Sequence, residues 1–359
     1  MAKRVAVWGT GNVGAPALRA VIAHRDLELA AVIVSSPEKE GIDAGELAGM
    51  SLTTGVLATR DWRSVLSKGC DAVVYAAIVE GRAEEAFEQV LACLESGASV
   101  VASGFYTLQT EVDAPREQLA RVAAATGPTG SSLMVSGIDP GWNMDILPIT
   151  LSALSSEITE IRSQEIMNYR DYHQPAIVRY TVGFGQPMDE LPPMLTEGAL
   201  HTIWGPMVRA MGKALDCPVD RISSTVERRP LEKSVDVPGM GRFEVGTLGA
   251  FRFQVIGHRG DRQPFVVEHI TRIDDDCAPD WPYPPEGAGC HRVLITGNPT
   301  VNVTIHSDDP YDHGPASGGN ATAACWLVNA VPAVCAAPAG LVEAGSIPMM
   351  PVGGQLVGD

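Results

Sequence analysis

The densest group of side chains suited to proton transfer lies between residues 165 and 173. It contains Glu165, Asn168, Tyr169, Tyr172 and His173. A carboxylate among tyrosine, methionine and phenylalanine side chains is expected to have a raised pKa, which suits proton transfer near neutral pH. We therefore predict Glu165 and Tyr169 as catalytic residues and Asn168, Tyr172 and His173 as substrate contacts. The alternative is an ordinary strand end whose polar residues face solvent.

A second group of residues has the spacing of a phosphate-binding turn. The glycines of G-x-G-x-x-G permit a tight turn, a close approach of the backbone to a pyrophosphate, and packing of the next helix on its strand. Here an apolar strand at 5–8 precedes the turn and a helical stretch at 15–22 follows it, so free N–H groups of the helix start face the phosphates. The alternative is a purely structural glycine turn. The predicted cofactor contacts are Gly9, Thr10, Gly11, Asn12, Val13 and Gly14.

Cofactor choice is expected at the end of the second strand, residues 27–34. An NAD site usually has an acidic residue there, which binds the ribose 2′-hydroxyl. This chain has Ser35, Ser36 and, after Pro37 and Glu38, Lys39. Two hydroxyls and a lysine suit a 2′-phosphate, so NADP is the preferred prediction. If the serines only form the turn, NAD is also accepted.

Loops after the later parallel strands should complete the site, because ligands bind outside the carboxyl ends of such strands. The loops at 76–80 and 103–107 qualify, as does the turn at 137–143. They supply the predicted cofactor contacts Ala76, Ala77, Ser103 and Asn143, the substrate contact Phe105 and the catalytic candidate Tyr106.

The elements that position these residues fall into two patterns. Up to about residue 140, apolar strands alternate with helices such as 84–96 and 115–126, which is typical of an α/β Rossmann-type doubly wound parallel sheet. Beyond it, the stretches 158–167, 243–256, 265–273 and 293–305 indicate a second, α+β domain with a mixed, mostly antiparallel sheet. Helices are expected at 198–215 and 175–182. The predicted domains are 1–140, 141–315 and 316–359, the last being a C-terminal helix (321–335) and tail that return to the first.

Composition narrows the function classes. The net charge of −17 disfavours nucleic-acid and anionic-membrane partners. Seven cysteines without C-x-x-C or zinc spacing predict reduced thiols in the cytoplasm, and no metal site is expected. The first strand starts too early to leave room for a signal peptide. The uncharged stretch 321–342 is interrupted by Asn329, Pro332 and Pro338, which favours a buried or interface helix over a membrane span.

Several segments together carry a family resemblance that runs nearly end to end. They are residues 7–14, 43–49, 136–143, 268–269, 278–282 and 320–323. In them the chain resembles proteins with a dihydrodipicolinate-reductase-like first domain, and within these the native amine dehydrogenases and 2,4-diaminopentanoate dehydrogenases. The resemblance implies a Rossmann domain, a substrate domain with a mixed sheet, a homodimer, and interconversion of an amine with a ketone plus ammonia by a nicotinamide cofactor.

The chain departs from those families at two places. It lacks the His-His-x-x-Lys cluster of true dihydrodipicolinate reductases, having Arg162 to Tyr169 there. The catalytic glutamate of the amine dehydrogenases follows the fifth parallel strand, where this chain has Phe105 and Tyr106 and no carboxylate before Glu111. Glu165 and Glu111 are therefore the candidate bases.

Three functions remain open on the sequence. The first is an NAD(P)-dependent oxidoreductase that reduces an imine formed from a carbonyl compound and ammonia. The second is an alcohol or aldehyde dehydrogenase of the same fold with Tyr106 or Tyr169 as the acid. The third is a cofactor-binding regulatory protein without turnover.

Overall fold

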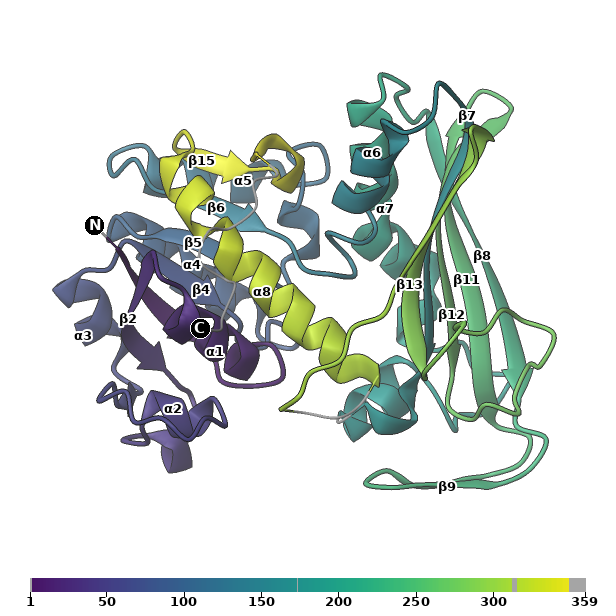
Figure 1. Ribbon diagram of the computed structural model, residues 1–359, viewed down its shortest axis with the longest axis horizontal. Helices are drawn as coiled ribbons and strands as arrows, with labels where there is room; N and C mark the ends of the chain where they lie inside the picture. Colours follow the sequence, from purple (N-terminus) through teal and green to yellow (C-terminus); the bar gives the residue numbers. More distant parts are fainter. Residues whose placement is uncertain (1, 173, 312–314, 349–359) are drawn as a thin grey trace, which may run out of the picture. The chain divides into compact units, whose positions relative to one another are not determined.

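The computed structural model describes residues 2–172, 174–311 and 315–348. The chain divides into two compact units (Figure 1). Unit 1 comprises the chain up to Ile138 together with the part from Asn320 onwards, and unit 2 runs from Asp139 to Gly319.

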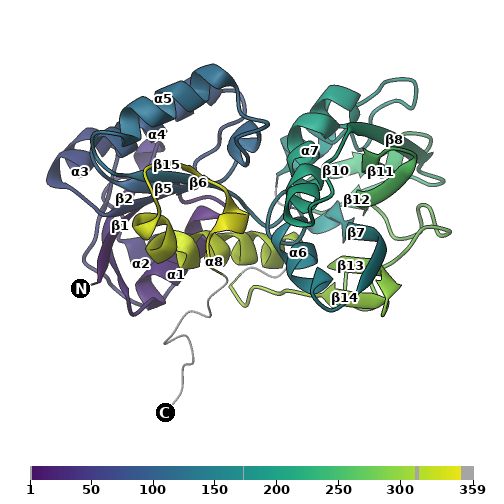
Figure 2. The ribbon, with the colours of Figure 1, turned by 90° about the horizontal axis from the view of Figure 1, so that it is seen from above.

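Unit 1 is built on a seven-stranded sheet in which every neighbouring pair is parallel. Helices cover both of its faces (Figure 2), so the predicted doubly wound Rossmann-type sheet is confirmed. Its central strands are buried apolar runs, as expected for strands covered on both sides. In sheet order the strands are β15 (Gly340–Val342), β6 (Ser132–Val135), β5 (Ser99–Ala102), β4 (Ala72–Tyr75), β1 (Lys3–Trp8), β2 (Leu27–Ile33) and β3 (Ala58–Thr59).

The helices of unit 1 begin and end close to the predicted positions where the pattern is strongly amphipathic. The predicted helices at 84–96 and 115–126 are α4 (Ala83–Glu95) and α5 (Arg116–Thr126). Two helices without a prediction are capped by aspartate side chains that accept from backbone N–H groups. These two helices are α2 (Ala44–Leu47) and α3 (Trp62–Lys68), and the remaining ones are α1 (Gly14–Ala23) and α8 (Pro315–Ala336).

The apolar helix α8 lies on the same face of the sheet as α1 (Figure 2). The hydroxyl of Ser132 on β6 donates to the carbonyl oxygen of Val334 at 2.5 Å. The segment Gly318–Ala336 of α8 is long and apolar enough to cross a membrane by length and composition, and it is the one such helix in the described part of the chain. Core helices pass the same test, and Leu327, Val328 and Val331 are buried against unit 1.

Unit 2 contains a six-stranded sheet in which only the β7–β12 pair is parallel. The predicted mixed, mostly antiparallel sheet is therefore confirmed. In sheet order the strands are β14 (Val301–Ile305), β13 (Gly289–Asn298), β7 (Glu157–Asn168), β12 (Arg262–Arg272), β11 (Leu248–Arg259) and β8 (Arg221–Pro230). The helices α6 (Ile146–Ser152) and α7 (Glu197–Ala214) lie against one face of this sheet (Figure 2). A small hairpin pairs β9 (Val235–Val237) with β10 (Gly241–Phe243).

Three of the expected elements of unit 2 differ in the structure. The stretch 293–305 is two strands, because a turn at Asn298 and Pro299 reverses the chain between β13 and β14. The stretch 243–256 becomes a strand only at Leu248, since Gly246, with φ 83°, forms a turn before it. The expected helix at 175–182 forms over residues 175–181, but its part Ile177–Thr181 is π-helical rather than α-helical.

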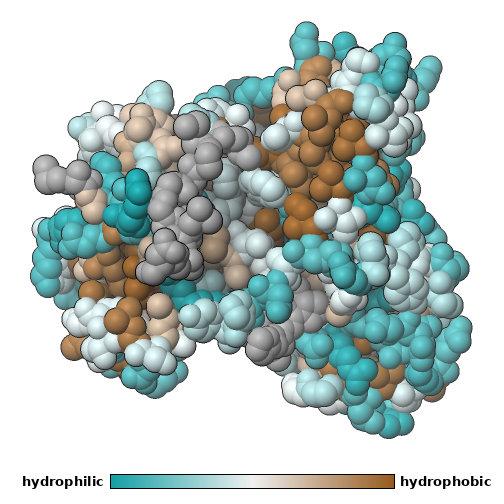
Figure 3. All heavy atoms as spheres, in the orientation of Figure 1, coloured by the Kyte–Doolittle hydropathy of each residue, from teal (hydrophilic) through white to brown (hydrophobic). Residues whose placement is uncertain are grey.

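The surface in the view of Figure 3 is largely hydrophilic, as the excess of acidic residues suggests, and hydrophobic residues gather over α6. The core of unit 2 is formed by apolar residues of the sheet and of α7, among them Phe251, Phe253 and Met207.

Candidate functional site

The glycine-rich turn of unit 1 joins β1 to α1, and its glycines have different surroundings. Gly9 has φ 98°, and a Cβ there would lie 2.8 Å from the backbone of Ala76 and Ala77. A Cβ on Gly14 would lie 2.1 Å from the carbonyl oxygen of Gly9. A Cβ on Gly11 would meet no atom of the part of the chain that the structure describes within 4 Å. Gly9 and Gly14 are therefore required by the protein's own packing, whereas the space beside Gly11 is open for a ligand.

A lysine stands over this turn. The Nζ of Lys39 donates to the carbonyl oxygen of Thr10 at 3.1 Å and to its Oγ1 at 3.0 Å. Lys39 ends the short 3-10 helix Pro37–Lys39 that follows β2. The structure thus brings together two predicted cofactor residues that are 29 positions apart in the sequence.

Two further charges lie near the end of β2. The Nε of Arg60 donates to the carbonyl oxygen of Ser35 at 3.2 Å. The hydroxyl of Ser36 donates to Glu38 and thereby lowers the pKa of that exposed carboxylate. The turn predicted to choose the cofactor therefore carries two cationic side chains, Lys39 and Arg60, and one ionised acid that is already bonded to Ser36.

The loop after β5 places its residues in several different environments. The backbone N–H of Ser103 donates to the carbonyl oxygen of Tyr75 at 3.3 Å. The ring of Phe105 packs in the core against Tyr75 and Phe87. The hydroxyl of Tyr106 donates to Glu80 at 3.1 Å. Glu111 is exposed, and its backbone N–H donates to Glu343 at 3.1 Å.

Unit 2 contains a row of three polar side chains across the middle of its sheet. Glu165 on β7 is in register with His269 on β12 and with His291 on β13. All three are buried, with 7 %, 4 % and 4 % of their surface exposed. The row exists because one parallel and one antiparallel neighbour place these residues on the same face of the sheet, the face that α7 covers.

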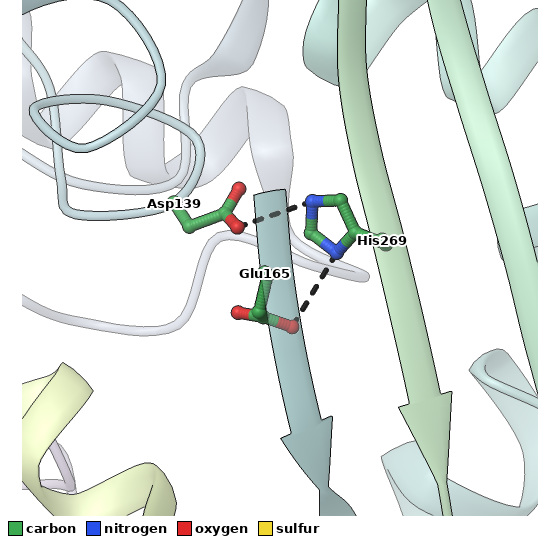
Figure 4. A group of neighbouring side chains, drawn as sticks. All are labelled: Asp139, Glu165 and His269. Carbon is green, nitrogen blue, oxygen red and sulfur yellow. Dashed lines mark ion pairs between the residues drawn. The ribbon is translucent and has the colours of Figure 1, made fainter. Parts of the chain in front are cut away.

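Asp139 adds a second carboxylate to this row (Figure 4). Its Oδ2 lies 3.1 Å from Nε2 of His269 and 3.9 Å from Nε2 of His291. The other ring nitrogen of His269, Nδ1, lies 3.4 Å from Oε1 of Glu165. His269 therefore lies between two carboxylates, one at each nitrogen.

The charges in this cluster depend on one another. Burial by itself lowers the pKa of an imidazole, but the negative charges of Asp139 and Glu165 raise the pKa of His269 to about 10. Burial likewise raises the pKa of a carboxyl group, yet the positive charge of His269 lowers the pKa of Glu165. The prediction of a raised pKa for Glu165 is therefore wrong. The sequence showed its apolar neighbours but not the imidazole facing it.

Tyr169 lies directly beside Glu165. Its hydroxyl donates to Oε1 of Glu165 at 3.2 Å, and burial together with the charge of Glu165 raises the pKa of Tyr169 well above its ordinary value. Its ring stacks on Tyr172 with 5.0 Å between the ring centroids. Tyr169 is thus a neutral hydrogen-bond donor, and Tyr172 extends the aromatic wall beside it.

Other predicted residues of this group are not brought to Glu165. The side chain of Asn168 bonds the backbone N–H of Arg170 and the carboxylate of Asp275, at 2.9 and 2.8 Å. Asn168 follows Glu165 by three residues on β7, and because side chains alternate along a strand it lies on the opposite face. Asn143, a predicted cofactor contact, is buried in unit 2, while the other predicted cofactor contacts are in unit 1. His173 lies outside the described residues.

Asp139, Glu165 and His269 are also of the types that bind divalent metals, and their candidate ligand atoms lie within 4.8 Å of one another. A histidine that binds a metal must direct a free lone pair at the ion. Here each ring nitrogen of His269 faces a carboxylate oxygen instead. This arrangement favours a doubly protonated imidazole.

Three residues of the cluster, Asp139, His269 and His291, were not among the predicted site residues. The sequence does carry a signal for His269: Glu268 and His269 interrupt the apolar stretch 265–273 of a strand whose residues are nearly all buried. Buried polar residues in such a strand need partners. Their partners come from β7, β11 and the chain before α6, and no local pattern shows those pairings.

Comparisons with known proteins point to the same family in both parts of the chain. Residues 142–357 match the family described as 2,4-diaminopentanoate dehydrogenase C-terminal domain, and residues 3–112 match that described as dihydrodipicolinate reductase, N-terminus. An amine dehydrogenase of Streptomyces virginiae is 47 % identical over 98 % of this chain and 97 % of its own length.

Two more distant proteins are also similar. A 2,4-diaminopentanoate dehydrogenase of Acetoanaerobium sticklandii is 22 % identical over 94 % of this chain and 91 % of its own. The solved structure of an amine dehydrogenase from Mycobacterium smegmatis has the same fold, with a TM-score of 0.76, 20 % identity, and coverage of 99 % of this chain and 98 % of its own.

Proposed function

This chain belongs to the family of the amine dehydrogenases and 2,4-diaminopentanoate dehydrogenases, and we propose that it catalyses the reductive amination of a small ketone or aldehyde with ammonia, and the reverse reaction. It is an oxidoreductase of CH–NH2 donors that uses a nicotinamide cofactor. The observation that carries the proposal for the site is the buried, ionised Glu165 beside the hydroxyl of Tyr169.

The glycine turn of unit 1 fits a dinucleotide. The open space beside Gly11 accommodates a pyrophosphate where a side chain would intrude, and Gly9 and Gly14 keep the strand and helix close enough to form the turn. The residues from Gly9 to Gly14 would hold the pyrophosphate, and Ser35, Ser36 and Lys39 the adenosine ribose. When bound, the nicotinamide cofactor supplies the hydride for amination or takes it up in the reverse direction.

Glu165 suits the nitrogen end of the substrate. Because its pKa is lowered, the carboxylate is negative at neutral pH and can stabilise an ammonium or iminium group. The hydroxyl of Tyr169 holds Oε1 of Glu165 and fixes the direction of the carboxylate. With Tyr172 it forms an aromatic wall, which favours a cationic nitrogen over water.

The test is a coupled assay of the purified protein with NADPH or NADH, ammonium and a panel of small ketones and aldehydes. We expect cofactor oxidation that requires both ammonia and a carbonyl compound, with an amine as product. Oxidation without ammonia would make the protein an alcohol or aldehyde dehydrogenase. Cofactor binding without turnover on any member of the panel would favour a regulatory protein.

We further propose that NADP is the preferred cofactor. Two cations, Lys39 and Arg60, stand where an NAD site has an acid that binds the ribose. NADPH should therefore bind more tightly than NADH, and Ser35→Asp should reverse the order by repelling the 2′-phosphate. Fluorescence titration of the wild type and of Ser35→Asp measures this. A tenfold preference of the wild type for NADH, about 1.4 kcal/mol, would contradict the proposal.

The family suggests a homodimer, and we propose this oligomeric state for the protein. Light scattering of the purified chain measures it. A cytoplasmic location is also proposed. Six cysteines are free thiols, which is the state expected in a reducing compartment: Cys70, Cys93, Cys217, Cys277, Cys290 and Cys335.

A further inference from the structure

We propose that His269 stores the proton that Glu165 delivers to the substrate nitrogen, and that Asp139 holds His269 in the orientation this requires. His269 and Asp139 are then positioning residues of the reaction, since they act through Glu165. This inference rests on the proposed function, because it assigns a source to the proton that imine reduction consumes.

The first support is the fixed orientation of the imidazole. The ring of His269 stacks on Phe253 with 4.5 Å between centroids and an interplanar angle of 13°. The ring of Trp204 lies edge-on to it, with 4.7 Å between centroids. The Nε1 of Trp204 also donates to Oδ1 of Asp139 at 2.8 Å. That bond occupies one oxygen of Asp139 and leaves Oδ2 facing Nε2 of His269, at 3.1 Å.

The second support is the charge of the surroundings. The titratable groups that contact His269 are Glu165 from β7 and Asp139 from the chain before α6. His291 from β13 and Tyr169 from the 3-10 turn Tyr169–Asp171 contact these carboxylates in turn. The neighbours from α7 and β11, Trp204 and Phe253, are uncharged. Two carboxylates in a site closed to water favour a positive imidazole, which is why the pKa of His269 rises to about 10.

The proton then has a defined route in the direction of amination. Glu165 is ionised at rest and carries this proton only in transit. The proton leaves Nδ1 of His269 for Oε1 of Glu165, 3.4 Å away, and passes on to the imine nitrogen. His269 remains as the neutral tautomer whose Nε2–H faces Asp139, and Glu165 is again a carboxylate. One N–H bond of His269 breaks and one N–H bond of the substrate forms, with no change of oxidation state in either residue. Proton-transfer contacts of this length are common without substrate and shorten when it binds.

The first experiment compares His269→Gln with the wild type. A glutamine keeps polar contacts but cannot store a proton, so kcat for amination should fall about 10²-fold, the usual scale for a lost proton-transfer group, with little change in KM or in NADPH affinity. The matched control is His258→Gln. His258 is a buried histidine of the same sheet, but it is bonded to Ser223 and Arg221 and has no carboxylate partner among the described residues. The control variant should retain near-wild-type kcat.

The pH dependence separates a stored proton from a merely structural histidine. Amination should be measured at a fixed concentration of unprotonated ammonia. Because the pKa of His269 is raised, the charged form persists at neutral pH, and the rate should fall only as pH rises towards 10. Asp139→Asn removes one of the two negative charges, so the falling limb should move to lower pH by one unit or more.

A measurement without turnover keeps the inference testable if a variant fails to fold or the proposed function fails. In protein labelled with ¹⁵N at histidine, both ring nitrogens of His269 should carry protons at pH 8, and this state should titrate at lower pH in Asp139→Asn. A neutral ring in the wild type at pH 8 would overturn the inference, whatever the reaction. Unchanged kcat in His269→Gln would overturn it too, as would activity abolished by EDTA and restored by Zn²⁺. An inactive wild type with a protonated His269 would instead contradict the proposed function.

Discussion

Glu165→Gln is expected to lower the turnover of amination by about 10²-fold or more, while NADPH affinity barely changes. Glutamine keeps the shape of the side chain but removes the negative charge that we propose for binding the substrate nitrogen. It also removes one of the two carboxylates beside His269, so the pKa of that imidazole should fall from about 10. Steady-state kinetics with saturating NADPH measures the first effect, and the histidine ¹⁵N spectrum measures the second.

The matched control for this variant is Glu111→Gln. Glu111 is the first carboxylate after β5, near where the family's catalytic glutamate is expected, but it is exposed and its backbone N–H is bonded to Glu343. Its replacement should be mild. If Glu165→Gln were nearly normal and Glu111→Gln inactive, the essential carboxylate would belong to unit 1. If both variants were fully active, a tyrosine-assisted reduction through Tyr106 or Tyr169 would explain the activity better.

Gly11→Val is expected to abolish cofactor binding without unfolding the protein. A Cβ at this position meets no atom of the described residues within 4 Å and the backbone there has no positive φ, so folding should tolerate the substitution. The same side chain occupies the space proposed for the pyrophosphate. Titration with NADPH tests binding, and thermal unfolding without cofactor tests the fold.

Gly14→Ala provides the contrasting variant. Its Cβ would lie 2.1 Å from the carbonyl oxygen of Gly9, so the strand and helix would have to move apart, and the melting temperature should drop. Undiminished NADPH affinity in Gly11→Val would show that the turn does not hold the cofactor. A large loss of melting temperature in Gly11→Val would show that this glycine, like Gly14, is required by packing.

Local patterns in the sequence were sufficient for the fold class and for the glycine turn. Side-chain periodicity indicates the alternating strands and helices up to residue 140 and the long alternating stretches beyond it. Three glycines within six residues indicate the turn. The predicted bounds of strands were wrong where a single turn interrupts a stretch. The turn at Pro299, for example, divides one predicted strand into two.

Only the tertiary structure showed the cluster of Asp139, Glu165, His269 and His291. Glu165 and Tyr169 could be chosen from their types and spacing, but the pKa of Glu165 depends on His269, which is 104 positions away along the chain and becomes its neighbour only through the parallel pairing of β7 with β12. Asp139 reaches the same imidazole from a turn. Strand pairing brings distant residues together according to the register of the whole sheet, and short-range spacing carries no information about that register. The sequence therefore indicated Glu165 and Tyr169, while the fold decided which residues surround them and which charges they carry.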